Sequence, residues 1–308
     1  MSEIKKYNPA DANANTRAYM DSIWVEERLL DAVSPDLTME LYGKTFKTPI
    51  MTPAFSHLKV YGEGRKNGLM EYSEAARRMG AVNWIGMGEN EEFGEILSVG
   101  ADTIRIVKPY ADDGKVADQF AYAEKKGAFA IGVDIDHTFG SDGQDDLVVG
   151  ERMRPQTTAD MEAYVKGTKL PFIVKGVLSV RDAVKCAEAG VKGIVVSHHH
   201  GRLPYAVPPL MVLPEIVREV GGKYGMKIFV DCSIDRGSDA YKALALGADA
   251  VSVGRAMMPA LESRGVEGVM EKIEEMNKEL AMTMAFTGAK TLAEIDPTTL
   301  WINGRHAF

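Results

Sequence analysis

The sequence predicts an α/β protein that folds as a single (β/α)8 TIM barrel, and three observations support this class. From residue 49 onward, short apolar runs alternate with amphipathic segments, the pattern of strands and helices in a parallel α/β architecture. Eight such pairs fit into roughly 250 residues, which is the size of one barrel. No Pro- or Ser-rich linker divides the chain, so we expect one barrel domain over residues 47–308.

The predicted strands and helices alternate in order along the chain. We place the strands at residues 49–54, 82–87, 103–107, 129–136, 171–176, 193–196, 227–231 and 250–255. We place the helices at residues 64–79, 91–99, 113–126, 179–190, 207–220, 237–246 and 266–286. Glycine follows most of these helices, as is typical of helix ends, and Ser179 is a typical N-cap.

Two segments lie outside this repeat. Residues 1–46 lack a steady periodicity and are expected to form an N-terminal cover, with a helix at 24–30 and a strand at 37–42. The fourth strand opens into a long polar loop near residues 137–156. Loops of this length in a compact domain are usually functional, so we expect a lid.

Composition and charge narrow the range of functions. The 308 residues are 45% apolar and 26% charged, which is typical of a globular protein. A net charge of -8 argues against non-specific binding to nucleic acid or to an anionic membrane. The first residues have no apolar signal core, and the two cysteines fit neither a disulfide framework nor a metal knuckle. We therefore expect a cytoplasmic protein.

Polar side chains stand at the carboxyl ends of several predicted strands, where a barrel keeps its reacting groups. Asp134 and Asp136 end the fourth strand, Lys175 the fifth and Asp231 the seventh. Lys175 follows apolar residues, and a buried ammonium group needs an anion or an acceptor. The sequence leaves two interpretations open, a salt bridge to Asp134 or Asp231 and a contact with a bound ligand.

The last two strands carry a candidate phosphate site. Asp231 is followed by a turn that leads into a helix at Gly237, and Gly254 and Arg255 close the next strand. Barrels often bind phosphate there, on backbone amides at a helix N-terminus. Arg255 adds a guanidinium group that could hold two phosphate oxygens.

The sixth strand runs directly into His198, His199 and His200. Adjacent residues at a strand end point in different directions, so the three imidazoles cannot all face one ion, and we predict no metal site. A function for one imidazole as a base is better supported, with Arg202 holding an anionic substrate beside it. For His198 and His200 we expect hydrogen bonds within the loop.

Several stretches carry a resemblance to a known family: residues 173–177, 189–197, His199 with Gly201 and Arg202, 213–217 and 242–255. They resemble the FMN-dependent α-hydroxy acid oxidases and dehydrogenases, such as glycolate oxidase and lactate oxidase. The resemblance is strongest from about residue 170 to 295 and weaker from 36 to 136, where the strand with Asp134 and Asp136 still aligns.

The resemblance implies FMN as cofactor and the oxidation of a small 2-hydroxy acid. His199 would be the base while flavin N5 accepts the hydride, Arg202 would bind the substrate carboxylate, and Lys175 would stabilise negative charge on the flavin. We add Asp136 to these catalytic candidates. The implied cofactor-binding positions are Pro53, Ala54, Lys175, Ser197, Asp231, Arg236, Gly254 and Arg255.

Two motifs depart from the family pattern. The family has Ser-Asn-His-Gly-Gly-Arg at residues 197–202, where this chain places imidazoles on both sides of the expected base. The family phosphate loop is Asp-Gly-Gly-Ile-Arg, but residues 231–235 are Asp-Cys-Ser-Ile-Asp. Two alternatives stay open, a flavin-assisted isomerase or lyase and a flavin-free barrel that binds another anion or phosphate. The resemblance also implies a homo-oligomer that acts on a small carboxylate.

Overall fold

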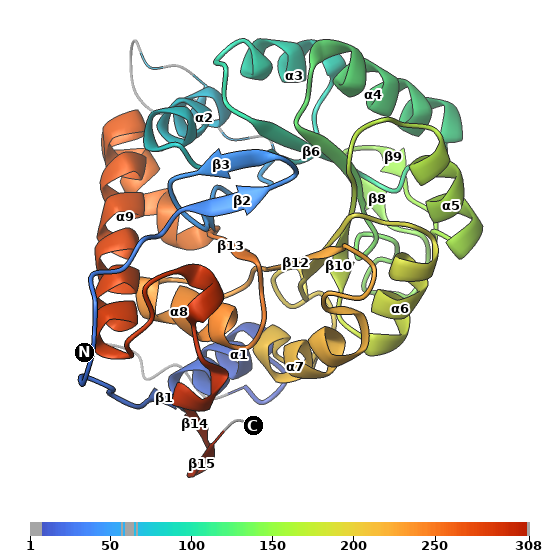
Figure 1. Cartoon of the computed structure of the whole chain (residues 1–308). Helices are drawn as coiled ribbons and strands as arrows, with labels where there is room; N and C mark the ends of the chain where they lie inside the picture. The colour runs from blue at the N-terminus through green and yellow to red at the C-terminus, as the bar shows by residue number, and fades with distance from the viewer. Residues whose placement is uncertain (1–7, 57, 59–64, 66, 307–308) are drawn as a thin grey trace, which may run out of the picture.

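The computed structural model describes residues 8–56, 58, 65 and 67–306, and its parallel strands form the predicted (β/α)8 barrel (Figure 1). The hydrogen-bonded order of the strands is β4-β13-β12-β11-β10-β7-β6-β5. Their bounds are β4 Ile50–Met51, β5 Asn83–Ile85, β6 Thr103–Val107, β7 Ala130–Asp134, β10 Phe172–Val177, β11 Gly193–Val196, β12 Lys227–Val230 and β13 Ala250–Ser252. Beyond the ends of β4 and β5, Gly86 N donates to Phe55 O at 2.8 Å, and this contact closes the ring.

Helices follow the strands and cover the outside of the barrel (Figure 1). Their bounds are α2 Gly68–Met79, α3 Asn90–Leu97, α4 Asp113–Lys126, α5 Thr158–Lys166, α6 Val180–Glu188, α7 Pro209–Val220, α8 Gly237–Ala245 and α9 Met258–Phe286. Ser179 caps α6 as predicted. The predicted helix start at residue 64 lies outside the described residues, and α5 lies outside every predicted helix. Within the described part of the chain, no helix has both the length and the apolar character needed to cross a bilayer.

The prediction of a helix at residues 24–30 is wrong. The chain there begins with β1 (Ile23–Val25), which pairs antiparallel with β14 (Leu300–Ile302), and β14 pairs with β15 (Arg305–His306). The partner strand lies near the opposite end of the chain, so local periodicity carries no trace of the pairing. The helix of this region is α1 (Ala12–Asp21), a mostly polar segment with Asp11 as its N-cap.

A hairpin of β2 (Met39–Leu41) and β3 (Lys44–Phe46) lies across the amino end of the barrel (Figure 1). The strand predicted at residues 37–42 is thereby confirmed. Tyr42 Oη donates to Lys192 O at 2.8 Å, just before β11 begins. Three side chains of the hairpin join the apolar core inside the barrel: Met39, Leu41 and Phe46. This end is filled, so the reacting groups lie at the other end.

The long loop after β7 contains a small hairpin. In it, β8 (Leu147–Val148) pairs with β9 (Glu151–Arg152). Phe139 forms an isolated antiparallel bridge with Asp145. The loop thus folds back on itself next to the carboxyl end of β7, in a position from which it can contact the residues at the neighbouring strand ends.

Candidate active site

A pocket opens at the carboxyl ends of the barrel strands and brings together most of the residues predicted from the sequence. The lining residues are Pro53, Ala54, Phe55, Lys175, His199, His200, Asp231, Cys232, Ser233, Ile234, Ser252, Gly254 and Arg255. Ser197 is buried beside the pocket, and its Oγ accepts from His199 N at 3.0 Å. Arg236 lies apart from this lining, exposed at the start of α8.

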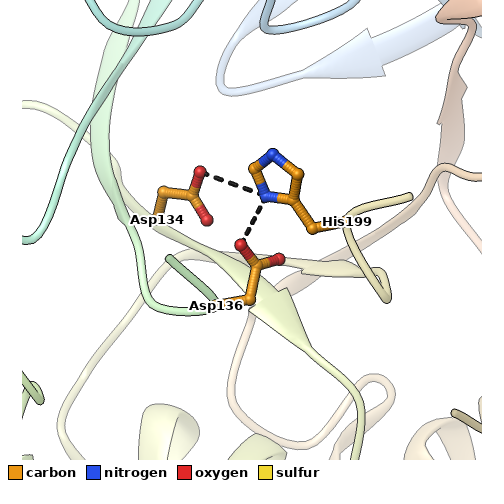
Figure 2. A group of neighbouring side chains, drawn as sticks. All are labelled: Asp134, Asp136 and His199. Carbon is orange, nitrogen blue, oxygen red and sulfur yellow. Dashed lines mark hydrogen bonds and ion pairs between the residues drawn. The ribbon is translucent and has the colours of Figure 1, made fainter. Parts of the chain in front are cut away.

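His199 directs one ring nitrogen at two carboxylates at the carboxyl end of β7 (Figure 2). Its Nδ1 is hydrogen-bonded to Asp136 Oδ1 and lies 3.3 Å from Asp134 Oδ2. The other ring nitrogen points away from both carboxylates. Ionised carboxylates can only accept, so in the neutral ring Nδ1 carries the hydrogen and Nε2 keeps a lone pair that can take a proton.

Gly176 gives Asp136 the space to reach this position. A Cβ atom on Gly176 would lie 2.4 Å from Asp136 Oδ2, and the φ angle of 95° is one that other residues rarely adopt. The pairing of β10 with β11 also shifts register between Lys175 and Val177, which marks an irregularity at the same point. Lys175 therefore supplies a charged side chain, and Gly176 leaves the space beside it that Asp136 occupies.

Lys175 is buried against the same group. Its Nζ lies 3.4 Å from His199 Nδ1, 3.9 Å from Asp136 Oδ2 and 3.5 Å from Asp231 Oδ2. Burial alone would lower the pKa of Lys175, but the charges of the nearby carboxylates raise it above its ordinary value. The ammonium group is therefore charged, and the salt bridge to Asp231, one of the two predicted interpretations, is present.

A second buried lysine balances the other carboxylate. Lys108 Nζ donates to Asp134 Oδ2 at 2.6 Å, and both side chains are buried. Burial alone would raise the pKa of Asp134, but the positive charges of Lys108, His199 and Lys175 hold it well below its usual range. Asp134 therefore stays ionised and contributes a fixed negative charge beside the imidazole.

The pKa values of Asp136 and His199 are both raised. Burial and the neighbouring charge of Asp134 raise the pKa of Asp136 to about 6. Burial and the charge of Lys175 would lower the pKa of His199, but the two carboxylates raise it above its ordinary value. The neutral form of His199, which can act as a base, is therefore reached only when the pH rises through that raised pKa.

The same three residues have the composition of a metal site, with ligand atoms that lie within 4.8 Å of one another: Asp134, Asp136 and His199. Two ammonium groups already lie against these carboxylates, that of Lys108 at 2.6 Å and that of Lys175 at 3.9 Å. A divalent cation would be repelled by both. We therefore interpret the group as a charge-balanced acid–base cluster.

Arg202 points to the long loop after β7. Its Nη2 donates to Asp146 Oδ2 and to Phe139 O, both at 2.6 Å. Its Nη1 lies 3.1 Å from His137 Nδ1. The guanidinium group predicted to bind a substrate carboxylate is thus bound by a carboxylate of the protein itself.

His137 links Arg202 to the acid–base cluster. Its ring packs edge-on against the ring of His199, with centroids 4.4 Å apart. Burial and the positive charges of Lys108 and His199 lower the pKa of His137 to about 3. His137 is therefore neutral and can accept a hydrogen bond from Arg202.

His198 makes a hydrogen bond within its loop, as predicted, whereas the ring of His200 contacts helix α1. His198 Nδ1 accepts from Gly201 N at 3.0 Å, and its Nε2 lies 2.8 Å from Thr16 Oγ1. His200 Nδ1 lies 2.9 Å from Asn13 Oδ1. The prediction is confirmed for His198 and wrong for His200, whose ring contacts helix α1 at the other end of the chain.

Two residues in the loop after β12 have backbone angles that glycine usually adopts, although neither residue is glycine. Cys232 has a φ angle of 70° and Ser233 one of 58°, in the left-handed region that few side chains adopt. These are the positions at which the resembling family has two glycines. The backbone conformation that lets amide groups approach an anion is therefore present although the glycines are not.

The pocket lining fits a flavin with a phosphate tail. Lys175 supplies a buried positive charge that could offset negative charge on a bound flavin, and Phe55 and Ile234 provide apolar walls. Arg255 presents an exposed guanidinium group for phosphate. At Gly254 a Cβ atom would have no neighbour closer than 3.8 Å, so the backbone there is open to a ligand. These residues would hold the cofactor that the resemblance implies.

The residues of the site that lie outside the predictions include Asn13, Thr16, His137 and Asp146. His137 has a local signal, since it directly follows Asp136 at a strand end. Asp146 lies in a polar loop among other acidic residues, and nothing in its surroundings distinguishes it. Asn13 acts on a residue 187 positions away, so only the folded chain reveals it.

Known proteins show clear similarity to this chain. Residues 7–166 and 148–302 match the family model described as FMN-dependent dehydrogenase. The peroxisomal (S)-2-hydroxyacid oxidase GLO3 of Arabidopsis thaliana is 28% identical over 92% of this chain and 86% of that protein. The glycolate oxidase of Spinacia oleracea is 28% identical over 91% of this chain and 85% of that protein. The L-lactate oxidase of Roseobacter sp. (strain GAI101) is 39% identical over 52% of this chain and 43% of that protein.

Solved structures extend the similarity to three dimensions. The crystal structure of mandelate oxidase with 3,3-difluoro-2-hydroxy-3-phenylpropionic acid has a TM-score of 0.82 and 28% identity, and the match covers 94% of this chain and 89% of that one. A mandelate oxidase mutant with the monooxide FMN adduct also has a TM-score of 0.82 and 28% identity, covering 96% of this chain and 92% of that one.

Proposed function

The chain belongs to the FMN-dependent dehydrogenase family, and we therefore propose that it uses FMN to oxidise a small 2-hydroxy acid. The sequence relatives and the solved structures described above are oxidases of 2-hydroxy acids, glycolate, L-lactate or mandelate. The observation that carries the proposal is the orientation of His199, with Nδ1 held by Asp136 and the other ring nitrogen directed away from the carboxylates (Figure 2).

His199 is the base in this proposal. Because Nδ1 holds a hydrogen between Asp136 and Asp134, Nε2 is the atom that accepts the hydroxyl proton of the substrate. The imidazolium group formed in this step has both carboxylates beside its Nδ1, and they offset its positive charge. Lys108 keeps Asp134 ionised, so the second of these charges is always present.

The cofactor half of the reaction depends on other residues. When bound, FMN supplies a two-electron acceptor, with N5 as the atom that takes the hydride equivalent. Lys175 would offset negative charge on the ring, and its ion pair with Asp231 holds it in the pocket. Arg255 and the left-handed backbone at Cys232 and Ser233 would hold the phosphate.

Arg202 binds the substrate carboxylate in this proposal. Its guanidinium group is now bound to Asp146, so substrate binding would exchange one carboxylate for another. Residues 137–156 would then act as a lid on a barrel of residues 47–308, with residues 1–46 as an N-terminal cover.

The absorbance spectrum of the freshly purified protein tests the proposal. Bound FMN would make the protein yellow, and anaerobic addition of glycolate, L-lactate or mandelate would bleach the visible flavin bands. A protein that stays colourless after incubation with FMN would rule out the cofactor and with it the function. A yellow protein that none of these acids bleaches would rule out the substrate class alone.

We further propose that the protein is a homo-oligomer. Large apolar side chains are exposed near β1 and the end of α9, among them Trp24 at 73%, Leu30 at 94% and Phe286 at 47%. Arg28 N donates to Phe286 O at 2.7 Å, so the two segments lie side by side. A second copy of the chain could cover this surface. Sedimentation velocity would contradict the proposal by showing a monomer at all concentrations.

A cytoplasmic location is also proposed. Cys186 and Cys232 are free thiols, the state that a reducing compartment maintains. Cell fractionation with an antibody against the protein measures the location directly, and recovery in a membrane or organelle fraction would contradict it.

A further inference from the structure

We infer that helix α1 holds the loops at the cofactor end of the pocket and so slows the release of the cofactor, a role that we call a latch. His198 and His200 are the residues through which the helix is attached, and we call these contacts its anchors. The inference rests on the proposed function, because it takes FMN to be the ligand of the pocket. One face of α1 is buried, with Ala12, Thr16 and Met20 on it. Side chains of the same helix reach three different loops at the mouth of the pocket, and each of those loops contributes to the lining.

Asn13 joins His200 to Arg255. Its Nδ2 donates to His200 O at 2.9 Å, which fixes the orientation of the amide group. Its Oδ1 accepts from Arg255 Nη2 at 2.8 Å and faces His200 Nδ1 at 2.9 Å. Because Oδ1 can only accept, Nδ1 of His200 carries the hydrogen. One side chain of α1 therefore holds two lining residues from two loops.

Thr16 holds His198 in a buried position. Thr16 is 1% exposed and His198 is 4% exposed. His198 Nδ1 accepts from Gly201 N, so in the neutral ring Nε2 carries the hydrogen and donates to Thr16 Oγ1 at 2.8 Å. Loss of this hydroxyl group would leave a buried N–H without its partner. The bond couples α1 to the loop that carries the proposed base.

Arg17 holds the third loop, residues 231–236. Its Nη1 donates to Ser233 O at 3.0 Å, and its guanidinium group makes two hydrogen bonds of 2.8 Å to Asp239. Asp239 in turn accepts from Arg236 N at 3.2 Å. This loop contains Cys232 and Ser233, whose backbone angles are left-handed although neither residue is glycine. Such a conformation must be supported by the rest of the structure.

These contacts account for the imidazoles that flank the proposed base. His198 and His200 hold α1 instead of transferring protons, and Asn13 holds Arg255 at the position proposed for phosphate binding. A cofactor that leaves past Arg255 and Ser233 must first break the contacts that these residues make with α1. The helix therefore slows the release of FMN.

The rate of FMN release from the loaded protein tests the latch, followed as the fluorescence of free FMN after dilution. Asn13→Ala and Thr16→Val each remove one anchor, and Thr16→Val does so with little change of shape. Asn15→Ala is the matched control, because Asn15 lies on the same helix and its side chain donates to Pro9 O at 2.9 Å. The wild-type protein completes the series.

We expect Asn13→Ala and Thr16→Val to release FMN about tenfold faster than the wild type, the effect of losing one or two hydrogen bonds. Asn15→Ala should release it at the wild-type rate. Equal rates in all four proteins would overturn the latch, whereas a wild-type protein that never retains FMN would reject the proposed function instead.

Amide hydrogen exchange over residues 12–21 of the proteins without added cofactor gives a second readout, for use if a variant loads FMN poorly. We expect faster exchange in Asn13→Ala and Thr16→Val than in Asn15→Ala. Unchanged exchange in both anchor variants would overturn the latch even without a release rate.

Discussion

The two sides of the pocket mouth are held in different ways. Beside β6, β7 and β11, buried charges fix one another, Lys108 with Asp134 and Asp136 with His199. Beside β12, β13 and β4, the pocket is lined by backbone and mostly small or uncharged side chains, and α1 holds it from outside. The first side, which we call the proton side, is ordered by neighbours in one sheet, and the second, the cofactor side, by a distant segment.

This difference indicates that the two sides depend on different sets of contacts, and the ion pair of Lys175 with Asp231 is a direct link between them. The charges of the proton side are buried and paired, so their pKa values depend on one another and little on solvent. The contacts of the cofactor side include the hydrogen bonds of Asn13 with the exposed residues His200 and Arg255, which can open while the buried ion pairs stay in place. Proton transfer and cofactor exchange should therefore respond to different substitutions.

The largest expected effect is that of His199→Ala on the proton side. Loss of the base should lower the rate of flavin reduction by a 2-hydroxy acid by about 10²-fold or more. FMN should stay bound, because the cofactor side is unchanged. Anaerobic stopped-flow absorbance measures the rate. His306→Ala, which removes an imidazole that packs on Trp301, is the control. A full rate in His199→Ala would reject the base, and loss of FMN would show that the two sides are coupled.

Lys108→Met tests whether the buried charges depend on one another. It leaves Asp134 buried without its nearest cation, and removing one partner of a buried pair costs about 3–5 kcal/mol of the free energy of unfolding. Arg152→Ala is the matched comparison, since Arg152 is 72% exposed in its ion pair with Asp145. It should cost less than about 1 kcal/mol. Denaturant titration measures both, and equal losses would show that Asp134 does not need Lys108.

The proton side of the pocket could be predicted from the sequence to a greater extent than the supports of the cofactor side. Asp136, Lys175 and His199 could be found because a parallel barrel brings its strand ends together whatever the remaining chain does. The contacts of α1 could not, because the helix is mostly polar and shows no clear apolar period. The orientation of the Arg202 side chain could not be predicted either, because it depends on how the irregular loop after β7 folds back. Fold and reacting groups were thus predictable, and the supports from distant segments were not.

Asp136→Asn should shift the pH dependence of kcat/KM and also lower its plateau. Only neutral His199 is a base, so kcat/KM falls as the pH drops through the pKa of His199, which the carboxylates raise. Removing one charge lowers that pKa, so the acid limb of kcat/KM moves to lower pH. The plateau should fall by about tenfold, the effect of losing one charged hydrogen bond. A pH profile in which the acid limb does not move would contradict the role of Asp136.

The smallest expected effect is that of Asp146→Asn. Its carboxylate and that of the substrate compete for Arg202, so the substitution should lower KM by about two- to fivefold, as expected for a partly exposed ion pair, with kcat little changed. Asp145→Asn, which loses the ion pair with exposed Arg152, is the control. A higher KM in Asp146→Asn would mean that Asp146 orients Arg202 instead. FMN release should stay at the wild-type rate, because this loop belongs to the proton side, and faster release would show that the lid also holds the cofactor.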